Sequence, residues 1–377
     1  DSVIRRMTRI NNMTPGSINL SQGFPDFDPP QEILDALKEA AEHGPHQYSI
    51  TFGAKNFRDA LAEMYTKKFA REIDPEKEIV VTCGGTEAMM AAMMTVCNPG
   101  DKVAVFSPFY ENYGADAILS GADPIYVPLV PPDFHYDSEA LERAFQAGAK
   151  ALILCNPSNP CGKVFTMEEM EEIAELAKRY DAFVITDEVY EYIIYGENRH
   201  ISMAALPGMY ERTITCSSLS KTYSMTGWRL GYAACNEEIV KTVNKLHQHV
   251  VTCATSFVQK AGVVALKEEK NEVTDMVKEY QRRRDYAVKA INEIDGLSCR
   301  CPKGAFYIFI NIEKLGMTGQ EFAPLLLENA KVALVPGDVF GTEGDHYVRM
   351  SFANSYENVV EGCKRLKEFV EKLRRNK

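Results

Sequence analysis

Short apolar runs alternate with amphipathic stretches between about residues 79 and 235. The five clearest runs each end in small or polar residues, and they are 79–82, 102–106, 151–155, 182–186 and 213–216. This alternation predicts an α/β fold with a mostly parallel central sheet flanked by helices. Because ligands bind at the carboxyl ends of strands in such sheets, we expect the polar residues after the five runs to meet in one pocket.

Two amphipathic stretches are predicted to be helices of this part, 167–179 and 238–249. The first has acidic residues at its start and basic residues at its end, which suits the helix macrodipole. After about residue 285 the pattern changes to shorter elements. Residues 305–310 and 347–351 alternate like strands, and 355–372 have the pattern of an amphipathic closing helix.

The change of pattern predicts two domains. The large domain is expected over residues 45–285, and both chain ends, 1–44 and 286–377, are expected to form a smaller α+β domain.

Charge and hydropathy exclude two classes of partner. Lys and Arg number 42 against 53 Asp and Glu, and a net charge of -11 would repel a nucleic-acid backbone. The longest apolar run, 88–97, is far shorter than the roughly 20 residues that a membrane-spanning helix needs. We therefore expect neither nucleic acid nor membrane as a partner.

The cysteine pattern predicts a reducing setting. Ten cysteines are scattered without a Cys-x-x-Cys pair, so neither a metal site nor a disulfide framework is indicated. The default expectation is a cytoplasmic protein. The sequence begins at Asp1 without Met, so a start residue or targeting segment could precede it.

The segment 218–232 carries the strongest chemical signal. Ser218 and Ser220 stand three and one residues before Lys221, and Arg229 follows it by eight. By itself, a lysine and an arginine at this spacing would be solvated surface charges. Further upstream, Gly85 and Thr86 lie between an apolar run and a helix, where free backbone N–H groups can bind phosphate, although a simple tight turn without a ligand is the commoner reason for such residues.

This segment resembles the Schiff-base lysine motif of the class I/II aminotransferases, the fold type I family of pyridoxal 5'-phosphate (PLP) enzymes, in its aspartate/aromatic aminotransferase-like subgroup. The resemblance covers essentially the whole chain. It implies that Lys221 holds PLP as a Schiff base. It also implies that the cofactor's phosphate is bound by Gly85, Thr86, Ser218, Ser220 and Arg229.

The same resemblance implies which residues contact the cofactor's pyridine ring. Asp187 matches the aspartate that pairs with the pyridine nitrogen and strengthens the electron sink. Tyr190 and Asn159 match the residues that hydrogen-bond the ring oxygen, and Tyr110 matches the aromatic residue that stacks on the ring. Without the resemblance, a helix cap, a turn asparagine and a core aromatic residue would explain Asp187, Asn159 and Tyr110.

Substrate contacts are implied in the same way. Arg349 matches the arginine that binds the substrate's α-carboxylate through a planar fork, and Gly23 lies where the family brings backbone close to that carboxylate. Asn159 is expected to contact the substrate too. Tyr48 resembles the tyrosine lent to the neighbouring subunit's phosphate site, which implies a homodimer.

These assignments predict an aminotransferase that moves an amino group from an L-amino acid to a 2-oxo acid such as 2-oxoglutarate. Lys221 is expected to move the proton from the substrate's Cα, with Asp187 and Tyr190 as further catalytic residues. Aspartate-using relatives carry a lysine after the two glycines where this chain has Thr86. That departure favours an aromatic or other neutral donor, although a different cation could replace the lysine.

Two alternatives stay open at this point. A cystathionine-type carbon–sulfur β-lyase would use the same Lys221, Asp187 and Arg349 to eliminate a substituent. A non-catalytic PLP-binding regulator would share the scaffold but would bind DNA in a salt-sensitive manner.

Overall fold

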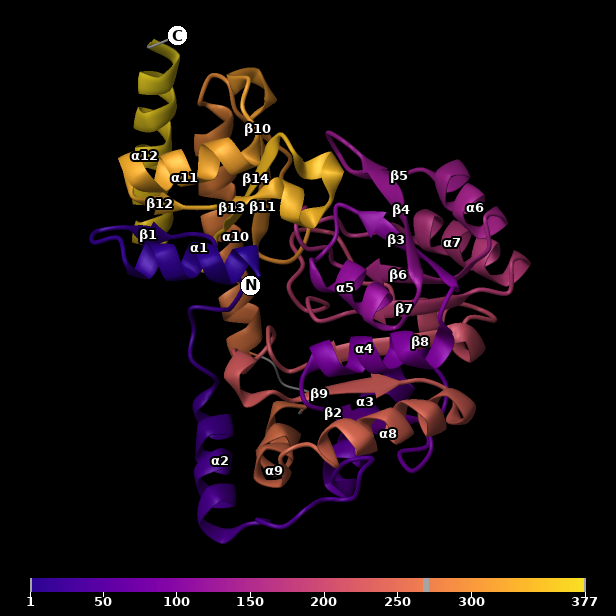
Figure 1. The fold of residues 1–377 in the computed structure, drawn as a ribbon. Coiled ribbons are helices and arrows are strands. Elements are labelled where there is room, and N and C mark those ends of the chain that lie inside the picture. The colour runs from indigo at the N-terminus through magenta and orange to yellow at the C-terminus, as the bar shows by residue number, and fades with distance from the viewer. Residues whose placement is uncertain (1, 267–270, 376–377) are drawn as a thin grey trace.

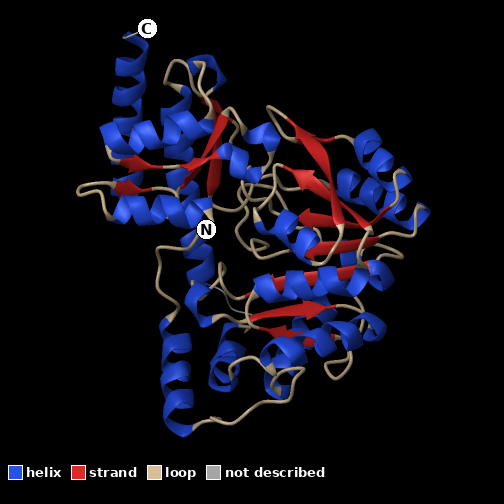
Figure 2. Cartoon of the chain, in the orientation of Figure 1, coloured by secondary structure: helices blue, strands red, loops and turns tan. Residues whose placement is uncertain are grey.

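The computed structural model describes residues 2–266 and 271–375. A larger part built around a twisted sheet lies beside a smaller part, and both chain termini lie in or next to the smaller part (Figure 1). Helices cover the sheets of both parts (Figure 2).

Within the described residues the larger sheet has eight strands, in which β9 runs antiparallel between β2 and β8, and β5 runs antiparallel at the other edge. The remaining six strands are parallel to one another, as predicted. In spatial order the strands are β2 (Ile79–Thr82), β9 (Gly231–Ala234), β8 (Thr213–Ser218), β7 (Phe183–Asp187), β6 (Ala149–Cys155), β3 (Lys102–Ser107), β4 (Asp123–Val130) and β5 (His135–Tyr136).

The central strands of this sheet are buried on both faces, which explains why a strand such as β6 is apolar over most of its length. On β6, Leu152 packs into the core that includes α6 and α7, whereas the next residue, Ile153, packs into the core that includes α4 and α8. The helices of this part are α3 (Lys55–Phe69), α4 (Gly85–Val96), α5 (Asn112–Leu119), α6 (Ser138–Gln146), α7 (Met167–Arg179), α8 (Glu237–Val251) and α9 (Ser256–Ala265).

The smaller part combines an antiparallel sheet with a short parallel pair. Its strands are β10 (Ser298–Cys299), β11 (Tyr307–Asn311), β14 (Tyr347–Ser351) and β13 (Val335–Pro336), with β1 (Ile18–Asn19) paired to β12 (Val332–Ala333). The helices beside them are α1 (Val3–Asn12), α10 (Asn271–Asn292), α11 (Gly319–Ala330) and α12 (Tyr356–Arg375). Short 3₁₀ turns occupy Met203–Ala205, Tyr210–Arg212, Thr226–Trp228, Glu313–Leu315, Gly337–Phe340 and Thr342–Gly344.

Local sequence signals account for most element ends. Helix α7 has the predicted bounds because Thr166 caps its start: the Thr166 hydroxyl accepts from the Glu169 N–H at 3.2 Å, and the Glu169 carboxylate accepts from the Thr166 N–H at 2.9 Å. Strand β11 begins at Tyr307, two residues later than predicted. The reason is that Ala305 has a left-handed backbone with φ +58° and forms a turn with Phe306.

The predicted domain boundaries at residues 45 and 285 stay a prediction. Helix α10 runs without interruption across position 285, and α2 (Gln31–His43) packs against α9 of the larger part rather than against the small sheet. Residues 267–270 of the predicted large domain, and 1, 376 and 377 of the predicted small domain, lie outside the described residues.

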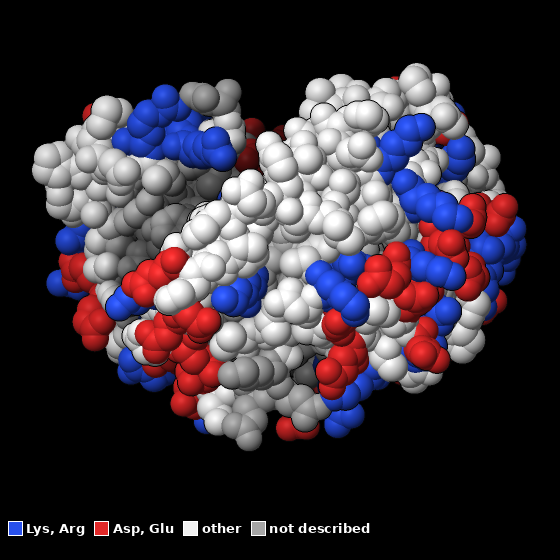
Figure 3. Space-filling view, turned by 90° about the horizontal axis from the view of Figure 1, so that it is seen from below, with Lys and Arg blue, Asp and Glu red and all other residues white. Residues whose placement is uncertain are grey.

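No helix among the described residues is long and apolar enough to cross a membrane. Seen from below, the surface carries basic and acidic side chains mixed along one side and a broad uncharged area in its middle (Figure 3).

Candidate active site

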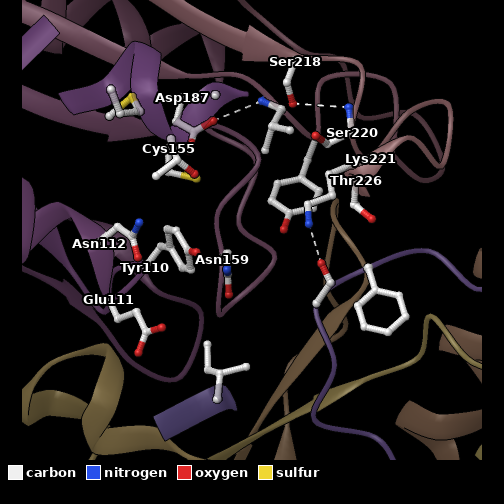
Figure 4. Close-up of a pocket in the computed structure, with 18 of the residues that line it drawn as sticks. Tyr110, Glu111, Asn112, Cys155, Asn159, Asp187, Ser218, Ser220, Lys221 and Thr226 are labelled. Carbon is white, nitrogen blue, oxygen red and sulfur yellow. Dashed lines mark hydrogen bonds between the residues drawn. The ribbon is translucent and has the colours of Figure 1, made fainter. Parts of the chain in front are cut away.

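The carboxyl ends of β2, β3, β6, β7 and β8 border one cavity of about 300 Å³. The polar clusters that follow the five predicted runs therefore converge in space, and Figure 4 shows them facing a common opening. The cavity is lined by these residues predicted from the sequence: Gly23, Gly85, Thr86, Tyr110, Asn159, Asp187, Tyr190, Ser218, Ser220, Lys221, Arg229 and Arg349.

The turn between β2 and α4 builds the end of the cavity where an anion would bind. Gly84 has φ +84°, and a Cβ atom there would lie 2.2 Å from Nη2 of Arg229, so glycine is required for the arginine to approach. Gly231 is needed for the same closeness, because its Cβ would lie 2.3 Å from the Gly84 carbonyl carbon. The start of α4, two serines and a guanidinium group thus face one space, which suits a phosphate.

Lys221 follows β8 and reaches across the cavity to the smaller part. Its Nζ donates a hydrogen bond to the backbone carbonyl of Gly23, as the dashed line in Figure 4 shows. Burial lowers the pKa of Lys221 to about 8, helped by the positive charges of Arg349 and Arg229 and opposed by Asp187. A lysine with this pKa is partly neutral near pH 7, as a nucleophile or base must be.

Competitive amine labelling of the cofactor-free protein should reveal this pKa. We expect the reactivity of Lys221 to rise through about pH 8 as the amine loses its proton, whereas the exposed Lys278 serves as an internal reference. Because the Arg349 charge lowers the Lys221 pKa, Arg349→Gln should move the transition to higher pH. Mass spectrometry of the labelled peptides gives both curves, and a Lys221 transition unaffected by Arg349→Gln would contradict the electrostatic assignment.

Asp187 ends β7 and presents its carboxylate to the opposite side of the cavity. Its Oδ2 accepts a hydrogen bond of 2.7 Å from the Tyr113 hydroxyl, and its Oδ1 accepts one of 3.3 Å from the Val189 N–H. Burial raises the pKa of Asp187, while these two hydrogen bonds and the Lys221 charge oppose the rise. A carboxylate held in this way can pair with a cationic ring nitrogen.

A buried ion-pair group fixes the turn that carries Asp187. The next residue, Glu188, accepts from Lys68 Nζ at 2.6 Å and from the Ser202 hydroxyl at 2.7 Å, and Lys68 also contacts Glu191. Burial alone would lower the pKa of Lys68, but the two carboxylates outweigh it and raise that pKa. The charge of Glu188 is thus compensated by Lys68, and Glu188 does not line the cavity, whereas Asp187 does.

Arg349 projects from β14 and brings the smaller part into the site. Its Nη1 donates to Asn159 Oδ1 at 2.9 Å and its Nη2 donates to the Ser21 carbonyl at 2.9 Å. The side chain is 1% exposed, yet its Nε has no hydrogen-bond partner among the described residues. A buried N–H of a cation without a partner is costly, so this group is suited to receive a carboxylate.

Tyr190 lies beside this arginine and contacts a residue that sequence reasoning missed. The hydroxyls of Tyr190 and Tyr307 are 2.9 Å apart, and the Arg349 guanidinium carbon lies 4.2 Å above the Tyr307 ring. Burial raises the pKa of both tyrosines, so both stay protonated as hydrogen-bond donors. Tyr307 stands within the predicted strand 305–310, where a hydroxyl on an apolar face was the available signal.

Other lining residues were missed as well. Tyr113 could have been predicted from the sequence, because it follows Tyr110 by three residues at the start of α5. The contribution of helix α1 could not have been predicted, because nothing in its sequence places Ser2, Ile4 and Arg5 at a cavity built by other segments. Among the predicted site residues, Tyr48 does not line the cavity; its side chain is 83% exposed on the segment between α2 and α3.

Known proteins resemble the chain over nearly its whole length. A model of the family aminotransferase class I and II matches residues 15–366. The aspartate aminotransferase of Pyrococcus abyssi is 40% identical over 370 residues, 97% of this chain and 95% of that relative. The aromatic-amino-acid aminotransferase 2 of Thermococcus litoralis is 38% identical, with the same coverage. The crystal structure of an aromatic aminotransferase from Pyrococcus horikoshii has a TM-score of 0.92 and 39% identity, covering 97% of this chain and 99% of that one.

Proposed function

This chain belongs to the aminotransferase class I and II family, and we propose that its cavity moves an amino group from a neutral or aromatic L-amino acid to a 2-oxo acid such as 2-oxoglutarate. Members of the family are PLP-dependent, so amino-group transfer with PLP follows from membership. The observation that supports the residue roles is the convergence of Lys221, Asp187 and Arg349 on one cavity.

The residues present fit PLP. The glycine turn before α4, Ser218, Ser220 and Arg229 offer a phosphate site. Lys221 offers an amine of lowered pKa to the aldehyde, and Asp187 offers a carboxylate to the ring nitrogen. When bound, PLP supplies the electron withdrawal that stabilises negative charge at the substrate's Cα.

The chain's own residues then position the substrate and move its proton. Arg349 binds the α-carboxylate with its unpartnered Nε and the fork nitrogens, and Asn159 holds that fork in place. Lys221 acts as the base that takes the proton from Cα. Burial keeps the Tyr190 hydroxyl protonated, so it would donate a hydrogen bond to the ring oxygen of bound PLP, and Tyr110 would hold the ring by stacking.

The donor is inferred from Thr86, which lies exposed on the cavity wall. The family resemblance implies a lysine at this position in aspartate-using enzymes. The similar proteins differ in the amino acid for which they are named, since one is an aspartate aminotransferase and another an aromatic-amino-acid aminotransferase. Without a lysine at position 86 the wall favours a neutral side chain. We therefore infer an aromatic or other neutral donor.

We infer a homodimer in which Tyr48 completes the partner's phosphate site. Tyr48 is 83% exposed and does not line its own cavity, and Ile50 beside it is 57% exposed. Apolar and aromatic side chains at this exposure are typical of a subunit interface. The cytoplasmic setting, inferred from the cysteine pattern, also stays a prediction.

A half-reaction with single amino acids tests the function. We expect phenylalanine, added to the loaded protein without a 2-oxo acid, to convert the visible spectrum to that of the aminated cofactor, and to do so faster than aspartate. Faster conversion by aspartate would overturn the inferred donor. Pyruvate and ammonia released from a cysteine conjugate without an acceptor would favour the β-lyase instead.

A further inference from the structure

Helix α1 brings a cationic side chain to the active-site cavity. Arg5, in its first turn, lines the cavity together with Lys221 and Arg349. In Figure 1 the start of α1 lies on the side of the smaller part that faces the larger part, and the hydrogen bond between Ser2 and Glu111 places it against the residue that precedes α5. Sequence reasoning assigned no role to this helix, so the arginine is an addition to the site.

The first turn of α1 is fixed to the opposite wall. The Ser2 hydroxyl donates a hydrogen bond to the carboxylate of Glu111, and the same hydroxyl oxygen accepts from the Arg5 N–H at 3.4 Å. Glu111 immediately follows Tyr110 and lines the cavity (Figure 4). Buried Met7 anchors the other side of the helix in the core. The Arg5 backbone is therefore held at the cavity rim.

The guanidinium group of Arg5 is available for a ligand. The structure gives it no hydrogen-bond or ion-pair partner among residues 2–266 and 271–375, and Arg5 is exposed. The other cations of the cavity already have functions in the proposed reaction: Arg229 faces the phosphate site, Arg349 the α-carboxylate, and Lys221 the proton at Cα. Of the basic residues that line the cavity in the described part of the chain, Arg5 therefore still lacks a role.

Arg5 also lies on the same side of the site as Thr86. Both residues line a second cavity of about 560 Å³ that shares Tyr110 and Asp116 with the first. A cation that reaches this region can take over the charge that a lysine at position 86 would supply. Because the guanidinium group of Arg5 is in water when no acid is bound, a neutral side chain would not have to displace a buried charge.

We propose that Arg5 binds the distal carboxylate of the dicarboxylic partner in the reaction, the five-carbon 2-oxo acid and its amino acid, glutamate. This rests on the proposed function and adds to it: a transaminase binds two substrates in turn at one site, and Arg5 serves the acidic one. Arg349 holds the α-carboxylate in both cases, so the two arginines bind the two ends of the diacid.

Half-reactions of glutamate and norvaline test the proposal, because the two amino acids have the same five-carbon backbone and differ in the distal carboxylate. We expect Arg5→Gln to lower kcat/KM for glutamate by about 10- to 100-fold and to change that for norvaline by less than about threefold. Arg5→Lys should recover part of the loss, since it keeps the charge. Arg6→Gln, an equal charge change on the next exposed residue of α1, is the matched control and should leave both substrates unchanged.

Equilibrium binding gives a second readout. We expect glutarate to bind the loaded protein more tightly than pentanoate, with a difference that shrinks in Arg5→Gln and at high salt. Equal losses for glutamate and norvaline in Arg5→Gln, or no loss with glutamate, would overturn the assignment. A wild-type protein that converts phenylalanine but not glutamate would overturn the role of Arg5 alone, whereas a wild-type protein that converts no amino acid would overturn the proposed function itself.

Discussion

Replacing Lys221 with alanine is expected to slow the half-reaction of the loaded enzyme with its amino acid by about 10⁴-fold or more. The amine of this residue is positioned by the Gly23 carbonyl, and burial lowers its pKa to about 8, so a neutral base is available near neutral pH. No second lysine lines the cavity among the described residues. Single-turnover spectroscopy of the wild type and the variant measures the difference directly.

Lys221→Arg is the matched control for this prediction. It keeps the length and positive charge of the side chain, but a guanidinium group stays protonated at every usable pH and cannot act as a base. We therefore expect the arginine variant to be as slow as the alanine variant. Borohydride reduction of the loaded wild type, followed by peptide mapping, should attach the cofactor's mass to Lys221. A variant that reacts within tenfold of the wild-type rate would exclude Lys221 as the base.

The sheet was predictable because the burial of each strand leaves an apolar pattern in a short stretch of sequence. Strands buried on both faces, such as β6 with Leu152 and Ile153 in different cores, are apolar over most of their length, and the carboxyl ends of parallel strands lie at one edge of the sheet. The capping box at Thr166 likewise fixed the start of α7 from four consecutive residues. The residue types that follow these strands then led to the candidate site through the family resemblance.

The contributions of other segments were not predictable in this way. Tyr307 reaches Tyr190 over 117 positions of sequence, and Arg5 reaches the cavity only because α1 packs beside β12 and β13 of the smaller part. The packing of α2 against α9 is another long-range contact that periodicity does not encode. Such placements depend on tertiary packing, for which a single sequence carries no periodic signal.

Asp187→Asn is expected to produce the second large loss, about 10²- to 10⁴-fold in the half-reaction. The substitution keeps the shape of the side chain but removes the charge that would face a cationic ring nitrogen, and an uncompensated buried charge costs about 3–5 kcal/mol. The single-turnover rate, measured at saturating amino acid, gives the loss. Reaction at the wild-type rate would show that the carboxylate of Asp187 does not act on the ring.

Tyr113→Phe separates the charge of Asp187 from its positioning. The variant removes the 2.7 Å hydrogen bond to Oδ2 but leaves the carboxylate in place, so we expect a loss of only about tenfold near neutral pH. That hydrogen bond lowers the pKa of Asp187, so its removal should raise the pKa further above the usual range. Activity that needs the charged form is lost as pH falls through this pKa, and the acid limb of the rate profile should therefore move to higher pH in Tyr113→Phe. An acid limb that stays where it is in the wild type would assign that limb to another group.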